Sequence, residues 1–150
     1  MPTLILKTRI NAPIEKCFDL SRSLDLHTES MKRYKEKVVG GKQTGLISLG
    51  EQVTWQACHF GISFKMTNKI TAMKCPYYFV DEMLNGPFKL LHHQHHFTAA
   101  GAFTEMTDIF AFQSPMGLIG RAIDWLFLEY YLRKLLTIRN EAIKLAAEMS

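Results

Sequence analysis

The middle of the chain, from residue 37 to residue 113, consists of short runs of strand-like alternation separated by turn signals. In the run around Trp55, apolar and polar residues alternate strictly, as on a strand with one buried face. Asn85-Gly86 and Ala100-Gly101 are typical of hairpin turns between successive runs. Because parallel strands need a long crossover, usually a helix, this stretch predicts an antiparallel meander.

A strand and helices are expected on either side of this meander. Leu4 to Ile10 has the period-2 pattern of a half-buried strand, and Pro13 opens a short helix directly after it. A second short helix is expected over residues 26–33. Ser114-Pro115 is a helix start signal, and one helix is expected from there to about Met149. Its predicted buried face consists of Ile119, Ala122, Ile123, Leu126, Phe127, Tyr130 and Ile138.

This order of elements favours an α+β fold. A curved antiparallel sheet of six to seven strands wraps around the long C-terminal helix, and two short helices follow the first strand. The length of 150 residues fits one domain spanning residues 1–150. A curved sheet around one helix leaves space between the two, and such spaces hold ligands.

Charge and cysteine content exclude several classes of protein. Eighteen Lys and Arg against fourteen Asp and Glu give a formal charge of +4, without the basic stripe of a nucleic-acid-binding protein. Cys17, Cys58 and Cys75 are odd in number and widely spaced, so neither a disulfide framework nor a thiolate zinc site is expected. No apolar run approaches the ~20 residues that span a bilayer. Lys7 and Arg9 interrupt the start where a secretory signal would be apolar, and a cytoplasmic location is therefore expected.

The run His92-His93-Gln94-His95-His96 is the strongest chemical candidate in the sequence. Strand alternation places His93 and His95 on one face, which we expect to be the cavity face, and the other two histidines on the outer face. A hairpin turn at Ala100-Gly101 would pair His93 directly with Asp108. Opposed side chains lie ~5 Å apart at their β-carbons, close enough for an imidazole–carboxylate hydrogen bond.

Four interpretations of His93, His95 and Asp108 remain open. They could anchor a ligand carbonyl or hydroxyl in an apolar pocket, or His93, oriented by Asp108, could act as an acid–base catalyst. The two histidines could also bind zinc, but no third ligand lies at a motif spacing, so we expect no metal site. The fourth interpretation is a core hydrogen-bond pair without a ligand. No cofactor is implied, because the sequence contains neither a phosphate-binding glycine loop nor a serine nucleophile elbow.

Motifs along nearly the whole chain resemble a known superfamily. They include Ile10-Asn11-Ala12-Pro13, Asp25-Leu26-His27, Val53-Thr54-Trp55, Phe79-Val80-Asp81-Glu82, Gly86-Pro87-Phe88 and the His93/His95/Phe97 strand. With these motifs the chain resembles the START-like or SRPBCC superfamily, the helix-grip fold of polyketide cyclase/dehydrases and birch-pollen-type allergens. Within it, the resemblance is to a bacterial ligand-binding branch sometimes labelled cell-division-inhibitor-like. It implies a helix-grip fold and a pocket for a hydrophobic small molecule, but no agreed reaction.

The expected function is the binding of a hydrophobic or aromatic small molecule that is lipid-, polyketide- or isoprenoid-like. Two alternatives remain: a cyclase- or dehydratase-type enzyme with a His93/Asp108 acid–base pair, and a membrane-associated lipid or quinone chaperone that uses the apolar segment around residues 116–127. Adaptable aromatic and methionine side chains suit the wall of such a cavity. The candidate binding residues, besides His93, His95 and Asp108, are Trp55, Phe64, Phe97, Met106, Phe110, Phe127, Tyr130 and, on the second short helix, His27.

Overall fold

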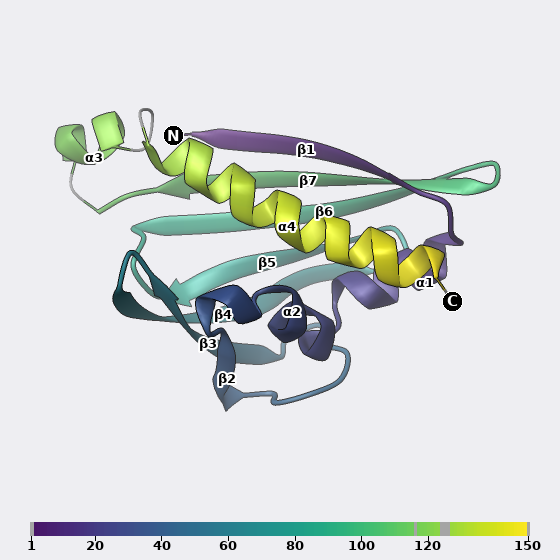
Figure 1. Cartoon of the computed structure of the whole chain (residues 1–150), viewed down its shortest axis with the longest axis horizontal. Helices are drawn as coiled ribbons and strands as arrows, with labels where there is room; N and C mark the ends of the chain where they lie inside the picture. Colours follow the sequence, from purple (N-terminus) through teal and green to yellow (C-terminus); the bar gives the residue numbers. More distant parts are fainter. Residues whose placement is uncertain (1, 116, 124–126, 150) are drawn as a thin grey trace.

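A seven-stranded antiparallel sheet forms the framework of the computed structural model, which describes residues 2–115, 117–123 and 127–149 (Figure 1). The strand order is β1-β7-β6-β5-β4-β3-β2, and every neighbouring pair is antiparallel. The predicted antiparallel sheet is therefore confirmed. The strands are β1 (Thr3–Ile10), β2 (Lys37–Gly41), β3 (Gln52–His59), β4 (Ile62–Lys74), β5 (Tyr78–Asn85), β6 (Leu90–Ala100) and β7 (Phe103–Gln113).

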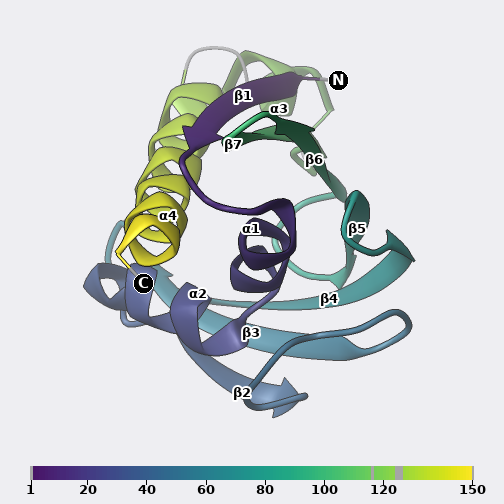
Figure 2. The ribbon, with the colours of Figure 1, turned by 90° about the vertical axis from the view of Figure 1, so that its right-hand side faces the viewer.

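Two short helices follow the first strand, as predicted. The helices α1 (Ile14–Ser21) and α2 (Leu24–Ser30) precede a single 3₁₀ turn at Lys32–Tyr34. Pro13 precedes the first turn of α1, and the Ser23 side chain accepts a hydrogen bond from the backbone N–H of Leu26 at the start of α2. In Figure 2 the sheet curls around α1, and α4 (Glu129–Glu148) lies along the open side of the curl.

The long C-terminal helix that the sequence predicts is confirmed as α4, but the predicted start of this helix at Ser114-Pro115 is wrong. The structure describes two helices, α3 (Gly117–Ile123) and the twenty-residue α4, and α3 lies beyond the N-terminal end of α4 (Figure 1). Ser114 and Pro115 are not helical, and Gly117, the first residue of α3, has a φ of 55°, in the left-handed region. Residues 124–126, which include Leu126 of the predicted buried face, lie outside the described residues, as does the side chain of Ile123.

The predicted buried face of this segment is wrong. Tyr130 and Ile119 are 75% and 68% exposed, Phe127 and Ala122 are exposed as well, and Ile138 is half-buried. The residues that α4 buries are Leu132, Leu136, Arg139, Asn140, Ile143 and Ala147. Because Arg139 and Asn140 interrupt this row, it does not form the continuous apolar stripe from which the buried face of a helix is predicted.

The register of the β6–β7 hairpin also differs from the prediction. His95 pairs with Asp108 and His93 with Phe110, which shifts the predicted pairing by two residues. The reason is the turn, which Gly101 and Ala102 form between the paired Ala100 and Phe103. A shift by two keeps every side chain on its face, and buried and less buried residues alternate along both strands as predicted.

The core lies between the concave face of the sheet and the helices. One cluster surrounds α1 and includes Phe18, Trp55, Phe97 and the buried Cys17. A second cluster joins Leu4 and Phe112 to α4 through Leu132 and Leu136. No helix in the described part of the chain combines the length and the apolarity that crossing a membrane requires.

Candidate functional site

A cavity of about 440 Å³ lies between the concave face of the sheet and the helices α2 and α4. Its walls are largely apolar, with Trp55 from β3, Phe64 from β4, Phe110 from β7 and Leu132 from α4. Pockets that bind small molecules typically measure roughly 300–1,000 Å³ and have walls of this kind. The cavity therefore has the size and the lining of a small-molecule site.

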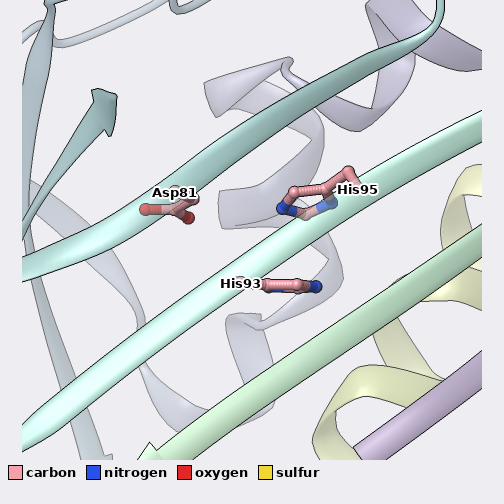
Figure 3. Close-up of side chains that lie close together, drawn as sticks. All are labelled: Asp81, His93 and His95. Carbon is pink, nitrogen blue, oxygen red and sulfur yellow. The ribbon is translucent and has the colours of Figure 1, made fainter. Parts of the chain in front are cut away.

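Three polar side chains meet on the sheet side of this cavity (Figure 3). His93 and His95 project from the same face of β6, and Asp81 lies directly opposite His93 on β5. Each of the three offers one nitrogen or oxygen atom, and these atoms all lie within 4.8 Å of one another. His95 is only 2% exposed and is stacked between the rings of Phe79 and His93, at centroid distances of 4.1 and 3.8 Å. We call Asp81, His93 and His95 the polar cluster.

Asp108, a fully buried carboxylate on β7, supports this cluster from the side. His93 Nε2 lies 2.7 Å from Asp108 Oδ1. Asn140 on α4 donates from Nδ2 to the other oxygen, Oδ2, at 2.7 Å. Arg139 Nη1 is 3.7 Å from Oδ1, and its Nη2 donates to the Ser21 carbonyl at 3.0 Å. The carboxylate thus ties the sheet to the middle of α4.

The charge states in this region follow from burial and from these partners. Burial on its own raises the pKa of Asp108, but the hydrogen bond with His93 and the nearby His95 outweigh burial and hold that pKa well below its usual value. Asp108 is therefore a carboxylate that only accepts, so His93 donates from Nε2. Burial lowers the pKa of His95 well below its usual value, and the adjacent His93 adds to this effect, so the His95 ring is neutral.

Asp81 and His95 retain unused hydrogen-bonding capacity. Burial raises the pKa of Asp81, although His93, His27 and Arg139 oppose the shift electrostatically. Among the residues that the structure describes, Asp81 Oδ1 and both ring nitrogens of His95 have no hydrogen-bond partner. His95 Nδ1 lies 3.4 Å from Asp108 Oδ1 without hydrogen-bond geometry. Buried polar atoms without a partner are rare, and these three atoms belong to residues that line the cavity.

A second group of rings lines the cavity near the start of α4. His59 Nδ1 and the Tyr131 hydroxyl share a hydrogen bond of 2.7 Å, and Tyr34 stacks on His59 at 5.0 Å. The exposed ring of Phe60 lies 4.5 Å from that of Tyr131. Burial lowers the pKa of His59 and raises that of Tyr131. We call His59, Phe60 and Tyr131 the aromatic rim.

The structure brings six of the eleven predicted site residues to the cavity wall: Trp55, Phe64, Phe110, His27, His93 and His95. His27 stacks on Trp55 at 4.4 Å and is hydrogen-bonded through Nε2 to Glu36 Oε1 at 2.9 Å. Asp108 does not line the cavity and reaches it only through His93. Ligand-binding roles for these residues stay predictions.

The other four predicted residues lie elsewhere. Phe97 and Met106 face inward as predicted, but they belong to the core around α1, where the Phe97 ring contacts Phe18 at 5.4 Å. Tyr130 points to solvent, and its neighbour Tyr131 lines the cavity in its place. Phe127 contacts the outside of the aromatic rim, 5.3 Å from Phe60. Inward alternation alone does not separate a cavity wall from a closed core.

Asp81, Arg139 and Asn140 are not among the predicted site residues, although Asp81 belongs to one of the motifs that carry the resemblance. The usable signal for Asp81 is its position two residues after the buried Phe79, which places a carboxylate on the inward face of β5. Arg139 and Asn140 carry no signal except their place in the row that also contains Leu136 and Ile143. Asp81 is also the third potential metal ligand that the spacing of the histidines alone does not provide.

Comparisons with known proteins show the fold. No protein-family model matches the chain, and no curated protein matches it in sequence. TTHA0849 from Thermus thermophilus superposes with a TM-score of 0.75 at 16% identity, covering 97% of this chain and 99% of that one. The major latex-like protein 151 from Panax ginseng gives 0.71 at 15% identity, covering 99% and 98%, and Ms6760 from Mycobacterium smegmatis gives 0.71 at 17%, covering 96% and 89%. These structures confirm the predicted helix-grip fold.

Proposed function

We propose that this chain binds a hydrophobic small molecule with one polar end, lipid-, polyketide- or isoprenoid-like, in the cavity between the sheet and α4. The observation that carries the proposal is the combination of largely apolar walls with one buried polar cluster. Burial of apolar ligand surface supplies affinity at roughly 25 cal/mol per Å² without fixing an orientation. The polar cluster supplies the orientation, because its nitrogen and oxygen atoms converge within 4.8 Å of one another on one side of the cavity.

The polar end of the ligand is expected to carry a carbonyl or a hydroxyl group. A neutral His95 offers one N–H donor and one nitrogen acceptor, and Asp81 Oδ1 offers a further acceptor. A ligand oxygen placed there would satisfy atoms that otherwise remain buried without a partner, and each such hydrogen bond contributes about 1 kcal/mol.

Native mass spectrometry of the freshly purified protein tests this function, because a retained small molecule adds its own mass to that of the chain. We expect a retained apolar compound, or failing that, saturable binding of a fluorescent naphthalene sulfonate probe that decan-1-ol displaces. The matched variants are His95→Gln inside the cavity and His96→Gln on the outer face of β6, and only the first should weaken binding of decan-1-ol. A protein without adduct mass and without saturable probe binding would contradict the proposal.

An acid–base enzyme is the second candidate, favoured by the 2.7 Å contact between His93 and Asp108. In this function Asp108 holds His93 in one tautomer, with Nε2 as the donor, so Nδ1 can accept a proton from a substrate. His93→Gln distinguishes the two functions. Loss of turnover with unchanged ligand affinity would favour the enzyme, whereas loss of affinity alone favours a binding protein.

A further inference from the structure

The geometry points to a divalent-cation site at the polar cluster, with Asp81, His93 and His95 as its three protein ligands (Figure 3). Zinc and similar cations bind nitrogen and oxygen ligands at about 2.0–2.2 Å in tetrahedral geometry, so two ligand atoms of one ion lie roughly 3.3–3.6 Å apart. The three ligand atoms of the polar cluster lie within 4.8 Å of one another. Side-chain shifts of about 1 Å would therefore bring them around one ion.

The sheet itself positions these ligands. His93 and His95 lie two residues apart on β6 and share a face, and Asp81 is the direct cross-strand neighbour of His93 on β5. Ligands on paired strands are held by the backbone ladder and need no flexible loop to bring them together. Such a site has no linear motif, because its third ligand comes from a different strand.

Unpartnered atoms are a second, independent observation. His95 is almost fully buried, its Nε2 has no hydrogen-bond partner in the described part of the chain, and its Nδ1 has only the 3.4 Å contact with Asp108 Oδ1. Asp81 Oδ1, which is also buried, lacks a partner among the same residues. A buried imidazole nitrogen and a buried carboxylate oxygen without partners are costly in a core, and one cation between them would compensate both.

The surroundings of His93 match the outer shell of known metal sites. Metal-binding histidines usually donate their second ring N–H to a carboxylate, which fixes the tautomer and leaves the other nitrogen for the metal. His93 makes this contact to Asp108 through Nε2 at 2.7 Å, which would leave Nδ1 for the ion. Asn140 and Arg139 hold Asp108 in turn, and the positive Arg139 offsets its charge. Asp81 is then the carboxylate that balances the ion.

The donor set indicates which ions fit. Two imidazoles and one carboxylate suit Zn²⁺, Fe²⁺ or Co²⁺, whereas Mg²⁺ and Ca²⁺ prefer oxygen ligands alone. Three protein ligands leave at least one coordination position open, and all three ligand residues line the cavity. The open position would then take an oxygen atom of the bound molecule, such as a carboxylate or an enolate. This last step rests on the proposed function, whereas cation binding itself does not.

Titration of the chelator-treated protein with Co²⁺ alone, followed by visible absorption, and with Zn²⁺ alone, followed by calorimetry, tests the site. We expect one ion per chain and the absorption of Co²⁺ bound to nitrogen and oxygen. Removal of an outer-shell residue typically lowers metal affinity roughly 10–100-fold, which is the loss expected for Asp108→Asn. Asp81→Asn and His95→Gln should each cost more than that.

His92→Gln and His96→Gln are the matched controls, because both rings lie on the outer face of the same strand and should leave affinity unchanged. Zn²⁺ should also raise the Tm of the wild type and not that of Asp81→Asn, whose folding is checked by circular dichroism. Absence of binding, or binding that survives in Asp81→Asn and His95→Gln, would overturn the inference. Probe binding by the metal-free protein is measured in parallel, so metal binding without probe binding would count against the proposed function alone.

Discussion

Asp108 is the residue on which the arrangement of the polar groups depends. It is fully buried, and His93 and Asn140 each contact one of its oxygens at 2.7 Å. Breaking a buried ion pair by removing one partner typically costs about 3–5 kcal/mol, because the remaining charge is left uncompensated near Arg139. We expect Asp108→Asn to lower the free energy of unfolding by about that amount, measured by urea denaturation at neutral pH. A loss within experimental error would show that the carboxylate is dispensable.

The bond between His93 and Asp108 predicts coupling between their substitutions. His93→Gln and Asp108→Asn remove the same contact, so the double variant should lose less stability than the sum of the single losses, by about 0.5–3 kcal/mol. Asp108→Asn combined with His96→Gln is the control and should be additive within about 0.5 kcal/mol. Full additivity of the first pair would mean that the 2.7 Å contact contributes nothing to stability.

His59 predicts a dependence of stability on pH. Burial lowers its pKa in the fold, although Glu36 opposes the shift. The unfolded chain therefore binds a proton near the ordinary pKa of ~6.5 while the folded chain does not, and stability falls as the pH drops below that value toward the folded pKa. We expect the free energy of unfolding of His59→Gln to decrease less between neutral pH and about pH 5 than that of the wild type. Tyr131→Phe should keep the wild-type slope, because burial and not the hydrogen bond is the main cause.

Individual residues differ in how far the sequence predicts them. Alternation is enough to place His93 and His95 on the inward face, because a strand has only two faces. Asp81 is a different case, because its proximity to His93 depends on the register between β5 and β6. That register is set by the conformation of the connection around Gly86 and Pro87, which the turn signal Asn85-Gly86 does not specify.

Among the elements, the strands β3 and β6 each place a buried aromatic residue on the inward face of the sheet, and we expect substitutions of these two residues to affect ligand binding differently. Both belong to the core cluster around α1, but only Trp55 also lines the cavity, whereas the Phe97 ring packs against Phe18. Trp55→Ala and Phe97→Ala should each cost about 3–5 kcal/mol of stability. Only Trp55→Ala should also weaken binding of the naphthalene sulfonate probe. Equal loss of probe affinity in both variants would mean that the two regions form one binding surface.

The elements themselves are predictable where period and turn signals agree. The meander and the two short helices meet this condition, because alternation, glycine turns and Pro13 all point to the same structure. The C-terminal segment does not, since an almost wholly apolar run gives no phase for a helix. The buried face of α4 includes Arg139 and Asn140, which are hydrogen-bonded to Ser21 and Asp108. These partners lie far away in the sequence, so only the folded structure reveals them.

For the whole molecule, we expect the thermal stability of the protein to depend on whether a ligand occupies the cavity. A ligand that binds only the folded state stabilises it by about 2.7 kcal/mol at a concentration of roughly 100 times its Kd. We expect decan-1-ol, which combines an apolar chain with a hydroxyl group, to raise the Tm with increasing concentration. His95→Gln should reduce this rise, and His96→Gln should not. A Tm that does not change with decan-1-ol would remove this class of compound from consideration.

The attachment of α4 to the rest of the molecule is uneven along its length. Asn140 and Arg139 tie its middle to Asp108 and Ser21, and Lys144 donates to the Arg9 carbonyl at 2.7 Å near its end. Before Leu136, the described contacts are mainly those of apolar and aromatic side chains around the cavity. In deuterium oxide, the backbone amides of residues 139–147 should therefore exchange much more slowly than those of residues 129–135. The first turns of α4 would then be the part that moves aside when a ligand enters.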